Sequence, residues 1–239
     1  MADMTAPSST FRLAYVPGVT PAKWVRIWGE RRPEVPLDLV STTTLDAPGL
    51  LRGGGVAAAL LRLPIDRDGL SVIMLYAETP VVVVPKDHVI TAADEVTTAD
   101  LVDETVLRPH DDRLDWVSRP GVAAAYRPDT TAEAIELVAA GVGVVVVPQS
   151  LARLHHRRDL SYRPVADAPA SPVALAWPTD ATTEFVEEFV GIVRGRTANS
   201  SRGHRPAPTR TAAEKAAAKR AARATAGKGA TRQGRRGRR

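Results

Sequence analysis

The sequence predicts an α/β protein, and three features of residues 130–154 carry this prediction. Thr130, followed by Glu133 three positions later, is a capping-box pattern that opens a helix, and Gly141 is placed to end that helix. The four valines 144–147 then favour a short, fully buried strand, because β-branched side chains suit strands better than helices. A strand that is apolar on both faces is typical of a parallel sheet covered on both sides, as in the α/β class.

The segments on either side alternate between strands and helices. Residues 11–16 predict a strand, Thr20 is the expected N-cap of an amphipathic helix over 21–31, and residues 37–41 predict a second strand. This order makes a βαβ unit with a right-handed crossover. Residues 110–129 predict no clear element. The other expected elements are helices at 45–52, 99–102, 150–156 and 183–193, and strands at 56–63, 70–76, 81–84, 105–107, 160–165 and 173–177.

Composition excludes several classes of protein. A chain of 239 residues can bury one sizeable core or two small lobes. No cysteine is present, which excludes disulfides, thiolate metal sites and cysteine nucleophiles. The first ten residues show no signal peptide, and no apolar run reaches the roughly 18–20 residues of a membrane helix. We therefore expect a soluble, cytoplasmic protein.

The net charge of +5 conceals two parts of opposite sign. Residues 194–239 contain 15 Lys and Arg against one acidic residue, a charge of +14. Residues 1–193 contain 17 Lys and Arg against 26 Asp and Glu, a charge of −9. An acidic folded body therefore carries a strongly basic tail, and the two parts need separate explanations.

Several local motifs, in their order along the chain, resemble one known family. The most specific is the run from Glu133 to Leu151, in which a helix, Ala-Gly-x-Gly, four valines and Pro-x-Ser follow one another. Weaker matches are FRLAYV at 11–16, RPEVPLDL at 32–39, ETPVVVVP at 78–85, ADL at 99–101 and VALAW at 173–177. Together they cover about residues 11–193 and resemble the effector-binding domain of LysR-type transcriptional regulators.

The resemblance implies a type 2 periplasmic-binding-protein-like fold with a cleft between two lobes. Three departures accompany it: no winged helix-turn-helix is seen before Phe11, Gly53-Gly54-Gly55 replaces a Gly-x-Leu-Asp-like step, and residues 108–130 look short for the helix and strand usual there. The expected divisions are a disordered segment 1–10, a domain 11–194 with lobe I at about 11–78 and 166–193 and lobe II at about 79–165, and a disordered basic tail 195–239.

The resemblance also implies ligand-binding residues around the cleft. Two helix N-termini, at Thr20 and at Thr130-Thr131, should face it, and their free N–H groups and positive dipole ends suit an anion such as a carboxylate. Leu63-Pro64 would form the facing lip, and Arg108 would add positive charge. The expected ligand-binding residues are thus Thr20, Leu63, Pro64, Arg108, Thr130 and Thr131. The alternative is that the threonines only cap their helices.

Other patterns indicate ordinary structure. Gly141-Val142-Gly143 follows a helix and opens a strand, which is the reverse of a dinucleotide-binding fingerprint. His110-Asp111-Asp112 lacks the spacing of a known metal-binding loop. Trp24, Trp28 and Trp177 lie at helical or strand spacing, which favours core or interface positions. No nucleophile–base arrangement is recognisable, so we expect no catalysis, no metal and no cofactor.

The basic tail predicts contact with nucleic acid. Thr211 and Glu214 form a capping-box pattern before an alanine-rich run with no large apolar residue, so this helix cannot dock on a core. Phosphate contacts without sequence specificity are expected. The alternatives are a solubilising tail or a tether to an acidic partner. The expected nucleic-acid-binding residues are Lys215, Lys219, Arg220, Arg223, Lys228, Arg232, Arg235 and Arg236.

These observations lead to one hypothesis with two alternatives. The leading hypothesis is a non-catalytic, effector-binding-like protein of transcription regulation, with a cleft for a small carboxylate and a tail on nucleic acid, associated with the nucleoid. Its expected partner is a second copy or a full-length regulator, without membrane attachment. The first alternative is a dimerisation module whose cleft is degenerate. The remote alternative is an enzyme on a periplasmic-binding-type fold.

Overall fold

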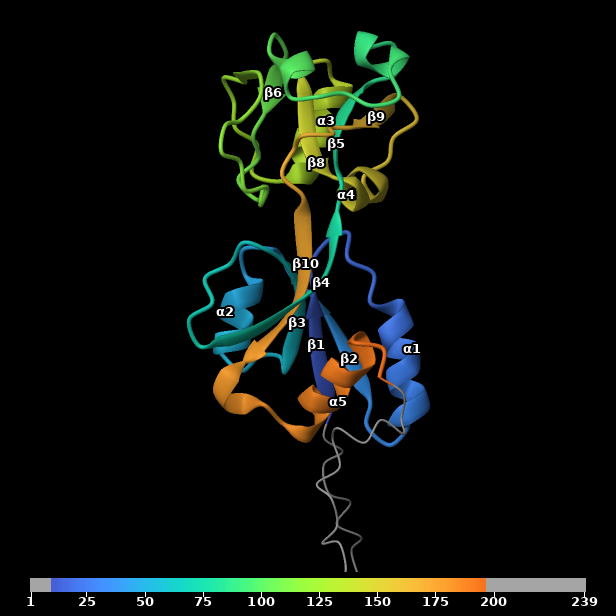
Figure 1. The fold of residues 1–239 in the computed structure, drawn as a ribbon, viewed down its shortest axis with the longest axis vertical. Helices are drawn as coiled ribbons and strands as arrows, with labels where there is room; N and C mark the ends of the chain where they lie inside the picture. Colours follow the sequence, from blue (N-terminus) through green and yellow to red (C-terminus); the bar gives the residue numbers. More distant parts are fainter. Residues whose placement is uncertain (1–9, 197–239) are drawn as a thin grey trace, which may run out of the picture. The chain divides into compact units, whose positions relative to one another are not determined.

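Two mixed five-stranded sheets organise the part of the chain that the computed structural model describes, residues 10–196 (Figure 1). The first sheet has the order β2-β1-β3-β10-β4, and the second has the order β7-β6-β8-β5-β9. The strands of the first are β1 (Phe11–Tyr15), β2 (Leu37–Ser41), β3 (Ala58–Arg62), β4 (Leu70–Glu78) and β10 (Ser171–Pro178). The strands of the second are β5 (Pro80–Pro85), β6 (Thr105–Leu107), β7 (Val122–Ala123), β8 (Val144–Pro148) and β9 (Leu160–Pro164).

Each sheet carries its own helices. We call the first sheet with its helices lobe I and the second lobe II. The chain passes from lobe I to lobe II at Thr79, between β4 and β5, and returns between β9 and β10. Lobe I has α1 (Ala22–Arg31), α2 (Ala47–Arg52), α5 (Glu184–Val193) and the 3-10 turn η3 (Thr179–Ala181). Lobe II has α3 (Thr131–Ala139), α4 (Gln149–Leu154) and the 3-10 turns η1 (Val89–Ala92) and η2 (Ala99–Leu101).

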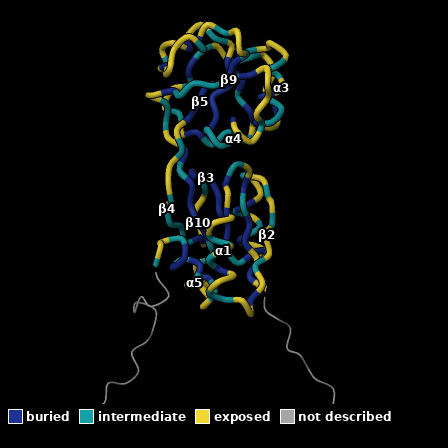
Figure 2. Tube along the Cα trace, turned by 90° about the vertical axis from the view of Figure 1, so that its right-hand side faces the viewer, coloured by how far each residue is buried: buried dark blue, intermediate teal, exposed yellow. Residues whose placement is uncertain are grey.

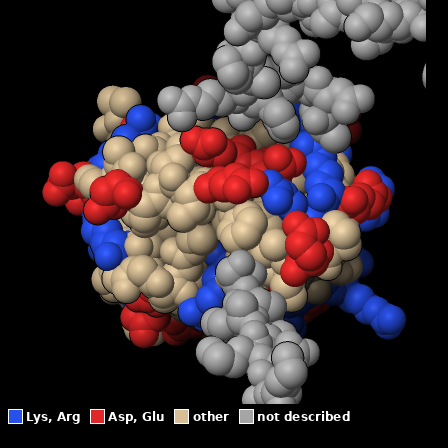
Figure 3. Space-filling model, turned by 90° about the horizontal axis from the view of Figure 1, so that it is seen from below, with Lys and Arg blue, Asp and Glu red and all other residues tan. Residues whose placement is uncertain are grey.

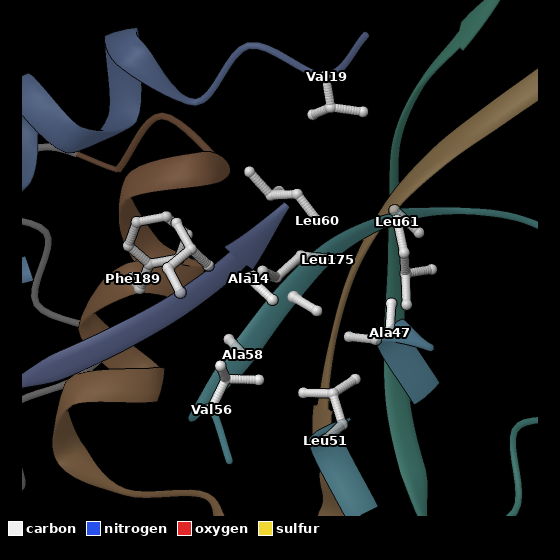
Figure 4. Close-up of a cluster of buried hydrophobic side chains, with 14 of the residues drawn as sticks. Ala14, Val19, Ala47, Leu51, Val56, Ala58, Leu60, Leu61, Leu175 and Phe189 are labelled. Carbon is white, nitrogen blue, oxygen red and sulfur yellow. The ribbon is translucent and has the colours of Figure 1, made fainter. Parts of the chain in front are cut away.

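The core of lobe I is aromatic between β1 and the helices α1 and α5. Phe11 of β1 stacks on Trp28 of α1 with ring centroids 4.6 Å apart and lies 5.4 Å from the ring of Phe189 of α5. Trp28 is 1% exposed, and its indole N–H donates to the Val35 carbonyl at 2.9 Å. This explains why a tryptophan can be buried here at no cost of an unpaired donor. Figure 4 shows the aliphatic part of the same core, where side chains of α2 meet the strands.

The valine strand β8 is buried on both faces, as its composition predicts. Val145 and Val147 pack with Ile135 of α3, whereas Val144 and Val146 pack with Leu101 on the opposite side. Because successive side chains of a strand point to opposite faces, one run of valines serves two apolar clusters. Figure 2 colours the chain by burial and shows buried segments inside each lobe and exposed segments mostly at its outside. The α/β class is therefore confirmed.

The pairing of β8 corrects one expectation. The valine run predicted a parallel sheet, yet β8 runs parallel to β6 and antiparallel to β5, and β5 is also antiparallel to β9. In lobe I, β10 is likewise antiparallel to both β3 and β4, next to the parallel pairs of β1 with β2 and β3. Burial on both faces requires only that the sheet is covered, so it does not fix strand direction.

The beginning of α1 differs from its expected form. Thr20 was the expected N-cap, but the helix starts one residue later, with Pro21 in the capping position and no side-chain hydrogen bond there. Residues 110–129 contain only the two-residue strand β7, which pairs with β6. No helix within residues 10–196 is long and apolar enough to cross a membrane.

The surface of lobe I mixes charges of both signs. Acidic and basic side chains lie beside one another on the face in Figure 3. Across α1 and α5, Arg31 pairs with Glu188 at 3.0 Å, and Arg32 pairs with Glu184. Hydrogen bonding to Glu184 raises the pKa of Arg32. These contacts fasten the last described helix to the first.

Candidate functional site

A cavity of about 430 Å³ lies between the loops of the two lobes. Lobe I contributes Pro17, residues 43–46 and Arg62, and lobe II contributes Pro109, residues 111–113, the start of α3 and one side of α4. The volume falls within the range of about 300–1,000 Å³ that is common for small-molecule sites. The wall is mostly apolar, with a few charged groups, which is the usual chemistry of such a site.

Arg62 is the charged group buried most deeply in this wall. It ends β3, where the preceding residues are alanine and leucine, and its side chain is 3% exposed. Its Nη2 donates to Ser150 Oγ at 2.7 Å and lies 3.3 Å from Glu78 Oε1. Its Nε and Nη1 are buried and have no hydrogen-bond partner among the described residues. Burial lowers the pKa of Arg62, and the Glu78 carboxylate partly counters that effect.

The start of α3 forms another part of the cavity wall. Thr130 is the N-cap, and its Oγ1 accepts the Glu133 N–H at 3.2 Å, while the Glu133 carboxylate accepts the Asp129 N–H at 2.8 Å. The capping-box pattern predicts such a reciprocal pair of hydrogen bonds. The one difference is that the Glu133 carboxylate accepts the N–H of Asp129 and not that of the N-cap residue Thr130. The pKa of Glu133 is lowered, chiefly by a hydrogen bond from Tyr126 and then by that N–H. The helix end is thereby fixed at the edge of the cavity.

Thr131 brings a carboxylate to the same helix end. The residue is 4% exposed, and its Oγ1 donates to Asp111 Oδ1 at 2.8 Å. Asp111 also lies close enough to His155 to favour the protonated ring. Desolvation has the larger effect and lowers the pKa of His155 below its ordinary value. Near neutral pH the ring is therefore neutral, and Asp111 has no cationic partner in it.

The structure brings together two of the six expected ligand-binding residues. Thr130 and Thr131 line the cavity. Thr20 lies in a separate hollow between α1 and β2, and Pro64 lies in another beside α2. Leu63 is 9% exposed and packs in the core of lobe I. Arg108 donates to the Gly121 carbonyl at 3.3 Å and does not line the cavity.

Arg62, Glu78 and Ser150 are the residues that sequence reasoning missed. A lone charge closing the apolar run AALLR was the available signal for Arg62, because an isolated buried charge needs a partner. Nothing local indicates its partners, which are 16 and 88 residues away. The expected nucleic-acid-binding residues of the tail lie outside the described residues. Within residues 10–196, no cluster of three His, Asp or Glu side chains could hold a metal ion.

Comparison with known proteins places the chain in a family. The family described as "LysR substrate binding domain" matches residues 5–198. A probable hydrogen peroxide-inducible genes activator of Mycobacterium avium is 31% identical over 151 residues, which is 58% of this chain and 49% of the relative. The transcriptional regulator CatR of Pseudomonas putida is 32% identical over 154 residues, 60% of this chain and 53% of the relative. The chain thus spans about half the length of these relatives.

Solved structures show the same fold at lower identity. The BenM effector-binding domain, solved with its effector benzoate, has a TM-score of 0.66 at 20% identity and covers 82% of this chain and 98% of its own. The oxidised form of OxyR has a TM-score of 0.65 at 19% identity, and the match covers 83% of this chain and 99% of the OxyR chain. These likenesses support the two-lobed, type 2 periplasmic-binding-protein-like fold. The match over residues 5–198 identifies the family: this chain belongs to the LysR substrate binding domain family.

Proposed function

We propose that the chain binds a small-molecule effector in the cavity between its lobes and acts, without catalysis, in transcription regulation. The observation that carries the proposal is Arg62, a residue of the cavity wall whose buried guanidinium atoms Nε and Nη1 have no partner among the described residues. A buried charged donor without a full set of acceptors is costly, and a ligand anion would complete the set. The benzoate complex of the BenM domain, whose fold is similar, supports a carboxylate as that anion.

A ligand bound at Arg62 would affect contacts of both lobes. The same guanidinium touches Ser150 of α4 in lobe II and Glu78 at the end of β4 in lobe I. A ligand that engages Arg62 therefore changes the contacts through which the lobes meet. Such differential contact is the requirement for a ligand to shift a conformational equilibrium. The output to transcription would then pass through a second copy or a full-length regulator, and through nucleic-acid contact by the basic tail.

A thermal-shift screen with small aliphatic and aromatic carboxylates tests this function. Ligands that bind the native state only should stabilise it, by ~2.7 kcal/mol at a hundredfold excess over Kd. Arg62→Met should abolish the shift, whereas Arg67→Met, an exposed arginine outside the cavity, should leave it intact. Absence of any shift in the unchanged protein across a broad panel would reject effector binding here.

A second candidate function is an interaction module that uses lobe I alone. The hollow at α1 and β2 is lined by apolar side chains, among them Val25 and the 40%-exposed Leu39. A self-complementary contact there would give a homodimer. Sedimentation of the unchanged protein against Leu39→Lys tests it: dissociation by the substitution supports the interface, and an unchanged mass rejects it.

A further inference from the structure

We infer that the effector is an amino carboxylate, carrying a cationic group as well as the anion and an apolar portion between or beside them. The inference rests on the proposed function, because it names the ligand class of the same cavity. It goes further in one respect: aspartates of the same cavity can pair with a positive charge of the ligand. Two observations support the inference. They are the charges of the residues that line the cavity, and the hydrogen bonds and ion pairs that the lining aspartates make with the protein.

Carboxylates outnumber cations around the cavity. Four aspartates line it, against two arginines and the neutral His155, and no lysine does. The aspartates are Asp46, Asp111, Asp112 and Asp129, and the arginines are Arg62 and Arg113. A ligand with negative charge at every polar end would be repelled wherever it approached one of these aspartates. The lining as a whole therefore suits a ligand of mixed charge.

Two of the four aspartates are engaged by the protein itself. Asp112 pairs with Arg119 at 2.5 Å and accepts the Leu114 N–H at 2.9 Å. Asp46 accepts a hydrogen bond from the Thr43 hydroxyl at 2.6 Å at the start of α2. The charge of Asp112 in particular is compensated within lobe II. Asp46, by contrast, accepts only this hydroxyl and has no cationic partner among the described residues.

Asp111 and Asp129 likewise have no cationic partner within residues 10–196. Asp111 accepts only the Thr131 hydroxyl, through Oδ1, and the carboxylate of Asp129 makes no hydrogen bond or ion pair with a described residue. Both lie at the N-terminal end of α3, the end that would otherwise attract an anion. Asp111 already places a carboxylate at that helix end. A second carboxylate from a ligand would be repelled there, whereas an ammonium group would pair with one or both aspartates.

Arg62 supplies independent evidence that a ligand anion belongs in this cavity. Its side chain is 97% buried, it lines the cavity, and its Nε and Nη1 have no partner within residues 10–196. Apolar side chains of β8 and α4 also line the cavity, including Val147, Leu151 and Leu154. An ammonium toward the start of α3, a carboxylate toward Arg62 and an apolar portion against α4 would satisfy all three regions together.

Matched ligand sets test the class directly. Each set contains an amino carboxylate, the same skeleton without the amine, and the same skeleton without the carboxylate. Suitable sets are leucine, 4-methylpentanoate and 3-methylbutylamine, and phenylalanine, 3-phenylpropanoate and phenethylamine. 5-Aminopentanoate and pentanoate add a wider separation of charges. Calorimetric titration of the whole chain with each compound gives the Kd values.

The expected result is that the best amino carboxylate binds at least tenfold more tightly than its desamino partner. Asp129→Asn and Asp111→Asn should reduce this preference, whereas Asp115→Asn, an exposed aspartate outside the cavity, should preserve it. Asp129 is itself exposed, so its substitution should fold even where that of Asp111 does not. Arg62→Met should weaken binding of both carboxylates.

Three outcomes would overturn the inference. If desamino carboxylates bind as tightly as amino carboxylates and Arg62→Met abolishes both, the ligand class is wrong and the proposed function stands. If the amine alone binds as well as the amino carboxylate and Arg62→Met has no effect, the anion end is wrong. If no compound of any set binds, the cavity does not take ligands of this kind, and the inference fails. Only a blank result in the wider carboxylate screen as well would remove the proposed function.

Discussion

Arg62 and Glu78 form an ion pair, 3.3 Å from Nη2 to Oε1, with side chains 3% and 11% exposed. Ser150 Oγ completes the group, accepting from Arg62 at 2.7 Å and donating to Glu78 Oε2 at 2.5 Å. The three residues come from β3, from the end of β4 and from α4, so this small polar group joins lobe I to lobe II. Arginine keeps its charge at any ordinary pH, and its pairing therefore decides the cost of its burial.

Removal of the Glu78 charge should be strongly destabilising. Glu78→Gln leaves the buried guanidinium without its counter-charge, and we expect a loss of about 3–5 kcal/mol in the free energy of unfolding. The double variant Arg62→Met with Glu78→Gln should recover much of that loss, because no charge is then buried alone. Urea denaturation of the three proteins gives the values. A loss below about 1 kcal/mol for Glu78→Gln, typical of an exposed pair, would contradict the burial argument.

Gly141 and Gly143 should differ in their tolerance of a methyl group. Gly141 has a φ of +77°, yet a Cβ there would meet no atom within 4 Å, so Gly141→Ala should cost about 1–2 kcal/mol from backbone strain alone. A Cβ on Gly143 would lie 2.3 Å from the Thr105 carbonyl oxygen, a backbone atom that cannot swing away. We expect Gly143→Ala to cost about 3 kcal/mol or more. Thermal denaturation of both variants measures the two losses of stability. Equal losses would contradict the prediction, because they would mean that β6 shifts away from β8 to make room for the methyl group.

His155 should make the protein less stable as the solution becomes acidic. Desolvation lowers its pKa in the folded state, and Asp111 and Glu136 only partly counter this. The unfolded chain then binds the proton first, so stability falls as the pH drops below about 6.5. His155→Gln should flatten the change in unfolding free energy between pH 7.5 and pH 5.5. The neighbouring variant His156→Gln serves as the control, and an equal slope for both variants would contradict the assignment.

The two threonine caps should have equal effects on stability and different effects on binding. Thr130 caps α3 at 3.2 Å, and Thr183 caps α5 at 3.3 Å. Replacing either by Ala should cost about 1 kcal/mol, the usual value of an N-cap hydrogen bond. Only Thr130 lines the cavity, so only Thr130→Ala should alter the ligand-induced thermal shift. Identical ligand shifts for both variants would place the ligand away from α3.

The tail should give salt-dependent affinity for nucleic acid. Contact with about six phosphates predicts a slope near −5 in a plot of log affinity against log salt concentration. A gel-shift titration of the full chain and of residues 1–196 on DNA of two unrelated sequences measures it. We expect the shorter protein to lose most of the affinity, with no preference between sequences. Equal affinity of both proteins would reject a role for the tail.

The sequence by itself determined the features that depend on neighbouring residues. The Thr130 cap, the end of α3 at Gly141 and the burial of residues 144–147 follow from side chains a few positions apart. These local signals were sufficient for the α/β class and for the resemblance that the family match confirmed. The mixed direction of the strands was not predictable in this way, because a buried valine strand satisfies either direction.

Only the tertiary structure decided which charged side chains line the cavity. Arg62 and Ser150 are 88 residues apart, and Thr131 and Asp111 are 20 apart, and no local pattern relates either pair. The expected contribution of Arg108 to the cleft also depended on distant packing, which instead directs its side chain to the Gly121 carbonyl. Helix caps arise from hydrogen bonds within one turn of chain. The cavity arises from the closure of long loops between two sheets, and burial there fixes which charges need a partner.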